Sequence, residues 1–189
     1  MKSIITIELV LLLMMILTKS LILRRNGITA LSFGKPDKNA LALIFIIACF
    51  VYATLAQTLG LPFPAIAGKP FWNIKILNIL AILICTSSLI WFGITLIIFG
   101  NSFRIGIDEK TDNQLIKTGT FAISRNPVFL AFIVFFWGVF LTYPNMITLI
   151  FLILLMMMVH RQIIKEEDFL KNHYGKEYED YSKKVRRYI

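Results

Sequence analysis

Two cations, Lys117 and Arg125, and a helix-starting dipeptide precede an apolar run in the second half of the chain. Arg125 is followed by Asn126 and Pro127, and apolar residues then continue to residue 142. Asn favours the N-cap of a helix and Pro its first turn, so a helix is predicted to begin here. The free N–H groups of a helix N-terminus attract anions, and an adjacent guanidinium strengthens that attraction. Two interpretations of Arg125 remain open: binding of an anionic ligand group, and contact with lipid headgroups.

Two adjacent glutamates, Glu166 and Glu167, follow a later apolar run. Adjacent helix positions point about 100° apart, so at most one of the two faces a given pocket. Glu167 has Lys171 four residues later, and this spacing predicts a local ion pair. Glu166 has Leu170 at the corresponding place and no cationic neighbour on its own face. Glu166 is therefore predicted to be the carboxylate that faces a cationic ligand.

The elements that must position these residues are apolar blocks of membrane-spanning length. The chain has 189 residues, of which 57% are hydrophobic and 16% charged, and its apolar blocks cover roughly 4–23, 40–60, 76–99, 127–142 and 146–164. About 20 helical residues cross a hydrocarbon core of about 30 Å. Only Tyr143-Pro144-Asn145 separates the last two blocks, which predicts a tight helical hairpin. The predicted fold is all-α, a polytopic membrane protein with five transmembrane helices.

The distribution of positive charge predicts the orientation in the membrane. The net charge is +9, and most of the Lys and Arg residues lie in 19–38, 100–126 and 161–189. With five spans these segments share one side, which the positive-inside rule places in the cytoplasm, with the N-terminus outside. Anionic lipid headgroups account for this basic excess, and nucleic-acid binding is not predicted. The histidines and cysteines show no metal-ligand spacing, so no metal site is predicted.

The chain divides into two functional parts. Residues 1–99 hold three transmembrane helices, and residues 100–189 form the predicted catalytic region, with a connector (100–126), the hairpin (127–164) and a cytoplasmic tail (165–189). Tyr174, Tyr178 and Tyr181 recur in the tail at helical spacing, which predicts an amphipathic helix on the membrane or over the hairpin. Packing is the role expected of these tyrosines. Connector and tail flank the hairpin, so they are predicted to meet at its cytoplasmic mouth.

This ordered set of motifs resembles the isoprenylcysteine carboxyl methyltransferase family of membrane enzymes, especially its short prokaryotic members. The related phospholipid methyltransferases share much of the pattern. The matching stretches are "GNSFRIGID", "NQLIKTGTFAISRNPVF", "KEEDFL", "YGKEYEDY" and "VRRY". The resemblance implies a methyltransferase that binds S-adenosyl-L-methionine at the cytoplasmic end of the hairpin. It also implies a lipid-like or prenylated acceptor, in contact with membrane lipids.

The resemblance also implies the residues of the site. With Arg125 and Glu166 from the argument above, the expected catalytic set is Arg125, Asn126 and Glu166. The family often has His where Asn126 stands, and because Asn does not titrate near neutral pH, no acid–base role is expected there. Eukaryotic members place a substrate-contacting Arg where Gln162 stands, so Gln162 and the adjacent Arg161 are the substrate-binding candidates. The implied cofactor contacts are Asn113, Gln114, Leu115, Ile116, Phe121, Asn126, Pro127, Val128, Phe129 and Glu166.

Several functions stay open at this point. A substrate carboxylate is ionised at pH 7, so its O-methylation needs no general base, which is consistent with the absence of a catalytic His or Cys cluster. A phospholipid amine is an alternative acceptor. A membrane reductase that uses NADPH is a second alternative, since "HRQIIKEEDFLKNHYGKEYEDY" also resembles the C-terminal end of sterol reductases. A non-catalytic membrane protein is the third. The oligomeric state is unknown.

Overall fold

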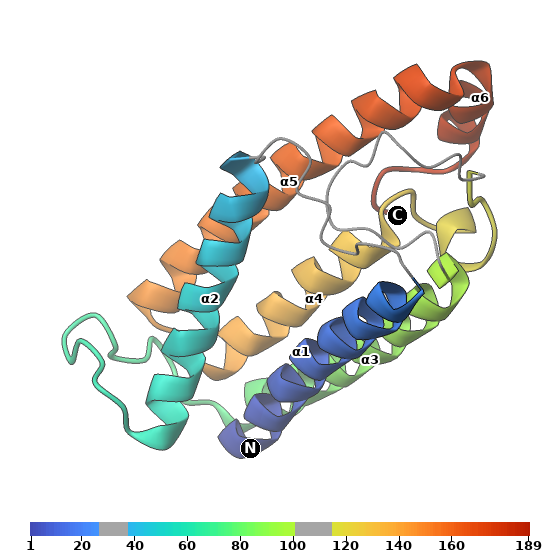
Figure 1. The fold of residues 1–189 in the computed structure, drawn as a ribbon. Coiled ribbons are helices and arrows are strands. Elements are labelled where there is room, and N and C mark those ends of the chain that lie inside the picture. Colours follow the sequence, from blue (N-terminus) through green and yellow to red (C-terminus); the bar gives the residue numbers. More distant parts are fainter. Residues whose placement is uncertain (27–37, 101–114) are drawn as a thin grey trace.

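Every regular element that the structure describes is a helix (Figure 1). The structure, a computed structural model, describes residues 1–26, 38–100 and 115–189. The predicted all-α class is confirmed for these residues. The elements are α1 (Lys2–Arg25), α2 (Lys38–Leu59), α3 (Lys75–Phe99), the short 3-10 helix η2 (Gly119–Ala122), α4 (Pro127–Thr142), α5 (Met146–Tyr174) and α6 (Lys176–Lys184).

Four helices are long and apolar enough to cross a membrane, namely α1, residues 41–59 of α2, α3 and α5. The fifth predicted span, α4, has only 16 residues. At a rise of about 1.5 Å per residue it measures about 24 Å, less than a hydrocarbon core of about 30 Å. The predicted count of five spans is therefore confirmed for four helices only.

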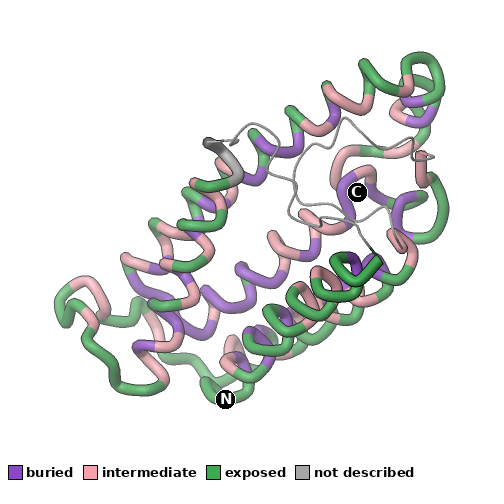
Figure 2. The backbone as a smooth tube through the Cα atoms, in the orientation of Figure 1, coloured by how far each residue is buried: buried purple, intermediate pink, exposed green. Residues whose placement is uncertain are grey.

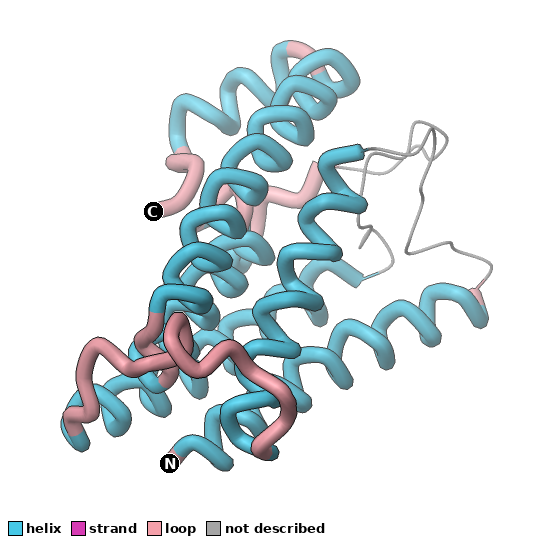
Figure 3. The backbone as a smooth tube through the Cα atoms, turned by 90° about the vertical axis from the view of Figure 1, so that its left-hand side faces the viewer, coloured by secondary structure: helices cyan, strands magenta, loops and turns pink. Residues whose placement is uncertain are grey.

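The helices run alternately up and down, so their ends gather at two ends of the bundle (Figure 1). The ends of α1, α3 and α5 lie at the same end as the start of α4. The opposite end holds the N-terminus and the loop between α2 and α3, as the side view also shows (Figure 3). The predicted hairpin turn lies where expected, between α4 and α5. However, α4 packs mainly against α3, and α5 packs mainly against α2.

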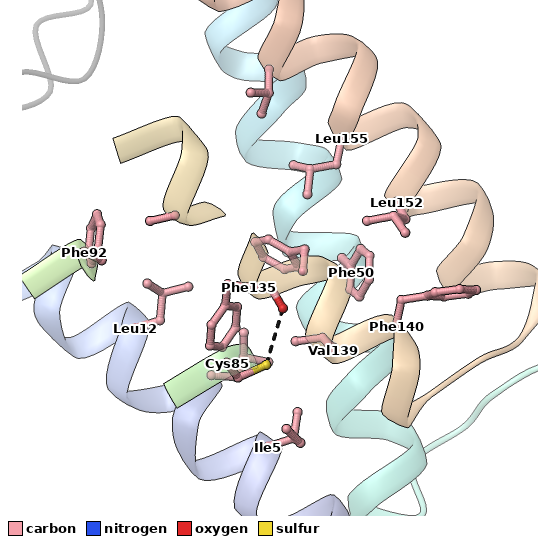
Figure 4. Packing of buried hydrophobic residues seen from close by; sticks show 14 of the residues in the cluster. Ile5, Leu12, Phe50, Cys85, Phe92, Phe135, Val139, Phe140, Leu152 and Leu155 are labelled. Atoms are coloured by element: carbon pink, nitrogen blue, oxygen red, sulfur yellow. Dashed lines mark hydrogen bonds between the residues drawn. The ribbon is translucent and has the colours of Figure 1, made fainter. Parts of the chain in front are cut away.

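Aromatic side chains of α4 fill the centre of the bundle and explain this separation of the hairpin arms. Phe135 and Phe136 are fully buried, and the ring of Phe136 meets that of Phe50 of α2 edge-on, with centroids 4.9 Å apart. Leu152 and Leu155 of α5 close the cluster (Figure 4). The outer faces of α1, α2 and α3 remain largely exposed (Figure 2). These faces are rich in Ile and Leu, and such a surface suits contact with lipid rather than water.

Gly138 allows α3 and α4 to approach closely. A Cβ atom at this position would lie 2.5 Å from Cys85 Sγ and 3.1 Å from the Ala81 carbonyl oxygen. The Cys85 thiol donates a hydrogen bond to the carbonyl of Phe135 in the same contact (Figure 4). The backbone atoms involved belong to two packed helices, so they have little room to shift.

We expect Gly138→Ala to force α3 and α4 apart and to lower the free energy of unfolding by about 1–3 kcal/mol, the usual cost of overpacking. Thermal unfolding followed by circular dichroism in detergent measures this loss. The double variant Gly138→Ala/Cys85→Ala removes the closest atom and is expected to recover part of the stability. An equal loss in both variants would show that the Cys85 contact does not limit the helix spacing.

Candidate functional site

The connector and the tail meet where α4 begins. Residues 185–189, here called the C-terminal strap, lie against residues 124–126. The backbone N–H of Arg125 donates to a strap carbonyl oxygen, that of residue 186, at 3.0 Å. The side-chain amide of Asn126 donates to the next carbonyl oxygen at 3.2 Å. The prediction that connector and tail meet at this end of the hairpin is confirmed for the described residues.

Glu167 is the carboxylate at the centre of this junction. Its side chain is buried, and it joins three segments of the chain. Oε1 accepts from the Asn126 amide at 2.9 Å. Oε2 accepts from Nε and Nη2 of Arg187 in the strap, at 3.0 and 2.9 Å, and lies 3.4 Å from Nη2 of Arg125. Two guanidinium groups and one amide therefore surround a single carboxylate. We call Arg125, Glu167 and Arg187 the ionic cluster.

The predicted ion pair between Glu167 and Lys171 is wrong. The ammonium group of Lys171 lies 3.4 Å from Glu179 of α6, and its side chain is 60% exposed. Glu167 pairs instead with the two buried or half-buried arginines, because charge-assisted hydrogen bonds away from water are stronger than a solvated pair along the helix. Glu166 is half-buried and accepts a hydrogen bond from the Gln162 amide at 3.0 Å. The glutamate next to Arg125 is thus Glu167, whereas Glu166 was expected there.

Asn126 and Pro127 begin α4 as predicted, but the Asn126 side chain does not cap the helix. Asn126 occupies the N-cap position and Pro127 the first turn, with no capping hydrogen bond from the side chain. The amide instead reaches Glu167 on α5, so it ties α4 to α5. Arg125 is 14% exposed at the side chain. This burial argues against the interpretation of Arg125 as a headgroup-binding residue at the surface.

The other residues predicted to contact the cofactor differ in how far they are buried. Phe121 is buried, and its carbonyl oxygen accepts from the Tyr181 hydroxyl at 2.6 Å. The Pro127 carbonyl accepts from the indole of Trp91 at 3.0 Å. Asn113 and Gln114 lie outside the described residues. Leu115, Ile116, Val128 and Phe129 are half-buried.

The two substrate-binding candidates on α5 differ in exposure. Arg161 is exposed at the surface, whereas Gln162 is buried within the bundle. The Gln162 amide N–H donates to Glu166, and the Gln162 Oε1 is buried without a hydrogen-bond partner among the described residues. Only Gln162 therefore lies inside the protein close to the two glutamates.

Two residues at the junction were not predicted for the site. Arg187 belongs to the "VRRY" motif, but 20 residues separate it from Glu167 and no helical spacing relates the two. Tyr178 was assigned to packing. Burial raises the pKa of Tyr178 to about 12, and the charges of Glu167, Arg125 and Arg187 all act on its hydroxyl. The hydrogen bonds that Arg187 donates to the Glu167 carboxylate raise the pKa of Arg187.

A further buried acid, Glu8, lies inside the predicted first span. The sequence analysis did not single it out. The carboxylate accepts a hydrogen bond from the Thr86 hydroxyl of α3, and its Oε2 has no partner among the described residues. Because an acid inside an apolar helix is costly, it usually faces the interior of a bundle and is satisfied there. Glu8 therefore links α1 to α3 and belongs to the bundle rather than to the junction.

The junction as a whole suits a polar ligand. Two arginines and one glutamate give the ionic cluster a net charge of +1. Three buried polar atoms at this end of the bundle lack hydrogen-bond partners in the part of the chain that the structure describes: Arg125 Nε, Gln162 Oε1 and Tyr178 Oη. Folded proteins rarely leave such atoms unsatisfied. Within the described residues no group of His, Cys, Asp and Glu side chains could hold a metal ion.

The fold and the junction define a helical membrane protein with a buried ionic site at one end of its bundle. The model of the phospholipid methyltransferase family matches residues 73–177, more than half of the chain, and the chain belongs to this family of membrane methyltransferases. The matched region runs from the start of α3 into α6 and includes both Arg125 and Glu167.

Curated relatives support the resemblance to the isoprenylcysteine enzymes. Two proteins named "Probable protein-S-isoprenylcysteine O-methyltransferase", from Oryza sativa subsp. indica and subsp. japonica, are each 27% identical to this chain over 164 residues. The alignments cover 85% of this chain and 80% of the rice proteins. No solved structure matches the chain. The predicted resemblance is confirmed.

Proposed function

We propose that this protein is an S-adenosyl-L-methionine-dependent methyltransferase that methylates an ionised carboxylate on a lipid-like or prenylated acceptor. Residues 100–189 carry the reaction in this proposal, and residues 1–99 support them. The ionic cluster of Arg125, Glu167 and Arg187 is the observation that carries it, because a buried set of charges at a membrane boundary suits charged reactants. The name of the rice relatives supports the choice of a prenylated carboxylate.

The residues at the junction fit the charged groups of the methyl donor. The donor contains a sulfonium, an ammonium and a carboxylate, and when bound it supplies an electrophilic methyl group. Gln162 has an unpartnered buried oxygen, and with Glu166 it presents amide and carboxylate oxygens to cationic groups. The backbone N–H groups at the start of α4 suit the donor carboxylate, because a helix N-terminus attracts anions. These groups would bind and orient the donor, while the strap excludes water from the reacting groups.

The position of the junction supports an acceptor delivered from the lipid. In this proposal Arg125 and Asn126, at the start of α4, lie near the membrane boundary, so that an apolar tail remains in the membrane while its polar end reaches the site. The basic residues of connector and tail favour a cytoplasmic site, with the N-terminus outside. Both placements belong to the proposal.

A carboxylate acceptor suits the residues better than an amine does. A carboxylate is already ionised at pH 7, whereas an ammonium group must first lose a proton. The Tyr178 hydroxyl, with a pKa of about 12, keeps its proton at pH 7 and is a donor rather than a base. Phospholipid N-methylation remains the second candidate because the family description names phospholipid methyltransferases.

We expect purified protein in lipid nanodiscs to transfer a labelled methyl group from S-adenosyl-L-methionine to a prenylcysteine carboxylate. The product should be a methyl ester, which releases the label on mild alkaline hydrolysis. Parallel reactions contain a free fatty acid or phosphatidylethanolamine, and a binding assay compares the donor with NADPH. Alkali-stable label on the amine would favour N-methylation instead. Binding of NADPH without binding of the donor would favour the reductase.

A further inference from the structure

The tyrosine pair on α6 is asymmetric in its hydrogen bonding. Tyr178 and Tyr181 are both buried, with ring centroids 6.1 Å apart in an edge-on contact. The Tyr181 hydroxyl donates to the Phe121 carbonyl oxygen at 2.6 Å. The Tyr178 hydroxyl, on a side chain that is only 4% exposed, has no partner among the described residues. Packing accounts for both rings, but it does not account for the buried hydroxyl of Tyr178.

Two cations and two anions act on this hydroxyl, and the carboxylate of Glu167 has the largest effect among them. Arg125, Arg187 and Glu167 act on it electrostatically, and Asp168, exposed on α5, has the smallest effect. The oxygens of Glu167 already accept hydrogen bonds from the Asn126 amide and from Arg187. Glu167 therefore does not accept a hydrogen bond from the Tyr178 hydroxyl.

Two buried donors beside the ionic cluster therefore lack an acceptor among the residues that the structure describes. The first is the Tyr178 hydroxyl, which keeps its proton because burial raises its pKa to about 12. The second is the Nε–H of Arg125. An unpaired buried donor costs about 1–3 kcal/mol, so a ligand that accepts from both gains from their pairing. A cationic group offers no acceptor to either donor, whereas an anionic oxygen can accept from both.

We propose that Tyr178 and Arg125 form an anion-binding subsite for the negatively charged head of an amphiphile, a carboxylate or a phosphate. The subsite deepens the proposed function, on which its assignment to the acceptor rests. The amphiphile is favoured over a free anion because the chain belongs to a family of phospholipid methyltransferases and has helices that are long and apolar enough to cross a membrane. Tyr178 then selects the ionised head over its neutral ester, and methylation of the head weakens its binding.

The test measures binding in detergent micelles without any methyl donor. The probes are N-acetyl-S-farnesylcysteine, its methyl ester and farnesyl phosphate. The unmodified protein is expected to bind the carboxylate about tenfold more tightly than the ester. Tyr178→Phe is expected to weaken carboxylate binding about tenfold, the loss of one hydrogen bond to a charged group, and to leave ester binding unchanged. Its thermal stability should be equal or higher, because no hydrogen bond within the protein is lost.

Tyr181→Phe is the matched control. It removes a hydroxyl that already has a partner, so it should lower thermal stability and keep the preference for the carboxylate. Tighter binding of farnesyl phosphate than of the carboxylate, with the same dependence on Tyr178, would support the subsite and assign it to a phosphate head. An unchanged carboxylate preference in Tyr178→Phe would overturn the subsite, as would the absence of any preference in the unmodified protein.

The two proposals fail in distinguishable ways. Methyl transfer to a carboxylate without Tyr178-dependent binding would overturn the subsite and leave the proposed function standing. Tyr178-dependent binding of the carboxylate without methyl transfer would support the subsite and contradict the proposed function.

Discussion

Glu167→Gln is expected to slow the proposed methyl transfer about a hundredfold and to lower the free energy of unfolding by about 3 kcal/mol. The substitution removes the negative charge that holds Arg125 and Arg187 together, and two guanidinium groups are then left facing each other in a largely buried place. Breaking a buried ion pair costs about 3–5 kcal/mol, and the partial exposure of Arg187 favours the lower end. Thermal unfolding and initial rates with labelled donor measure the two effects.

Glu166→Gln is the matched control, since it changes the adjacent residue in the same way. We expect weaker donor binding by about 1.5–3 kcal/mol, the range for a hydrogen bond to a charged group, with unchanged thermal stability. Glu167→Gln therefore tests whether a residue holds the junction together, and Glu166→Gln tests whether a residue contacts the donor. Loss of stability in Glu166→Gln, together with a stable Glu167→Gln, would contradict the assignment of the buried contacts.

Arg187→Ala is expected to detach the C-terminal strap and to lower the rate of methyl transfer roughly fiftyfold. The guanidinium makes two hydrogen bonds to Glu167, and each bond to a charged group is worth about 1.5–3 kcal/mol. The strap would retain its backbone contacts with the connector and the bond between the Tyr188 hydroxyl and His160. Limited proteolysis should then cleave near the C-terminus faster than in the unmodified protein.

Arg186→Ala provides the control for this prediction. Arg186 has an exposed side chain, and its backbone carbonyl accepts the hydrogen bond from the Arg125 N–H, so truncation of the side chain leaves that bond in place. We expect near-normal activity and proteolysis. Similar losses in both variants would show that the positive charge of the strap acts as a whole, without a specific role for Arg187.

The boundaries of the hairpin helices follow from local chemistry. Asn126-Pro127 starts α4, and Asn145 caps α5 by accepting from the backbone N–H groups of residues 147 and 148. Both signals depend on residues adjacent in sequence, so they could be predicted. The end of α5 could not be predicted from hydropathy. The helix continues to Tyr174, well beyond the apolar run, because backbone hydrogen bonding does not require apolar side chains.

The sequence by itself determined that the protein is helical and membrane-spanning, and that Arg125 and one of two glutamates lie at the same end of a hairpin. It also contained the motifs of the family to which the chain belongs. These features depend on composition, on the length of apolar runs and on residues close together in the chain.

Only the tertiary structure decided which glutamate faces Arg125 and which residues complete the junction. Helical geometry fixes the angle between Glu166 and Glu167, but the packing of α5 against α2 and α4 fixes which of them points inward. Arg187 and Tyr178 reach the ionic cluster because α6 and the strap fold back over the start of α4. Such long-range contacts leave no periodic signal, so they emerge only when the helices are packed.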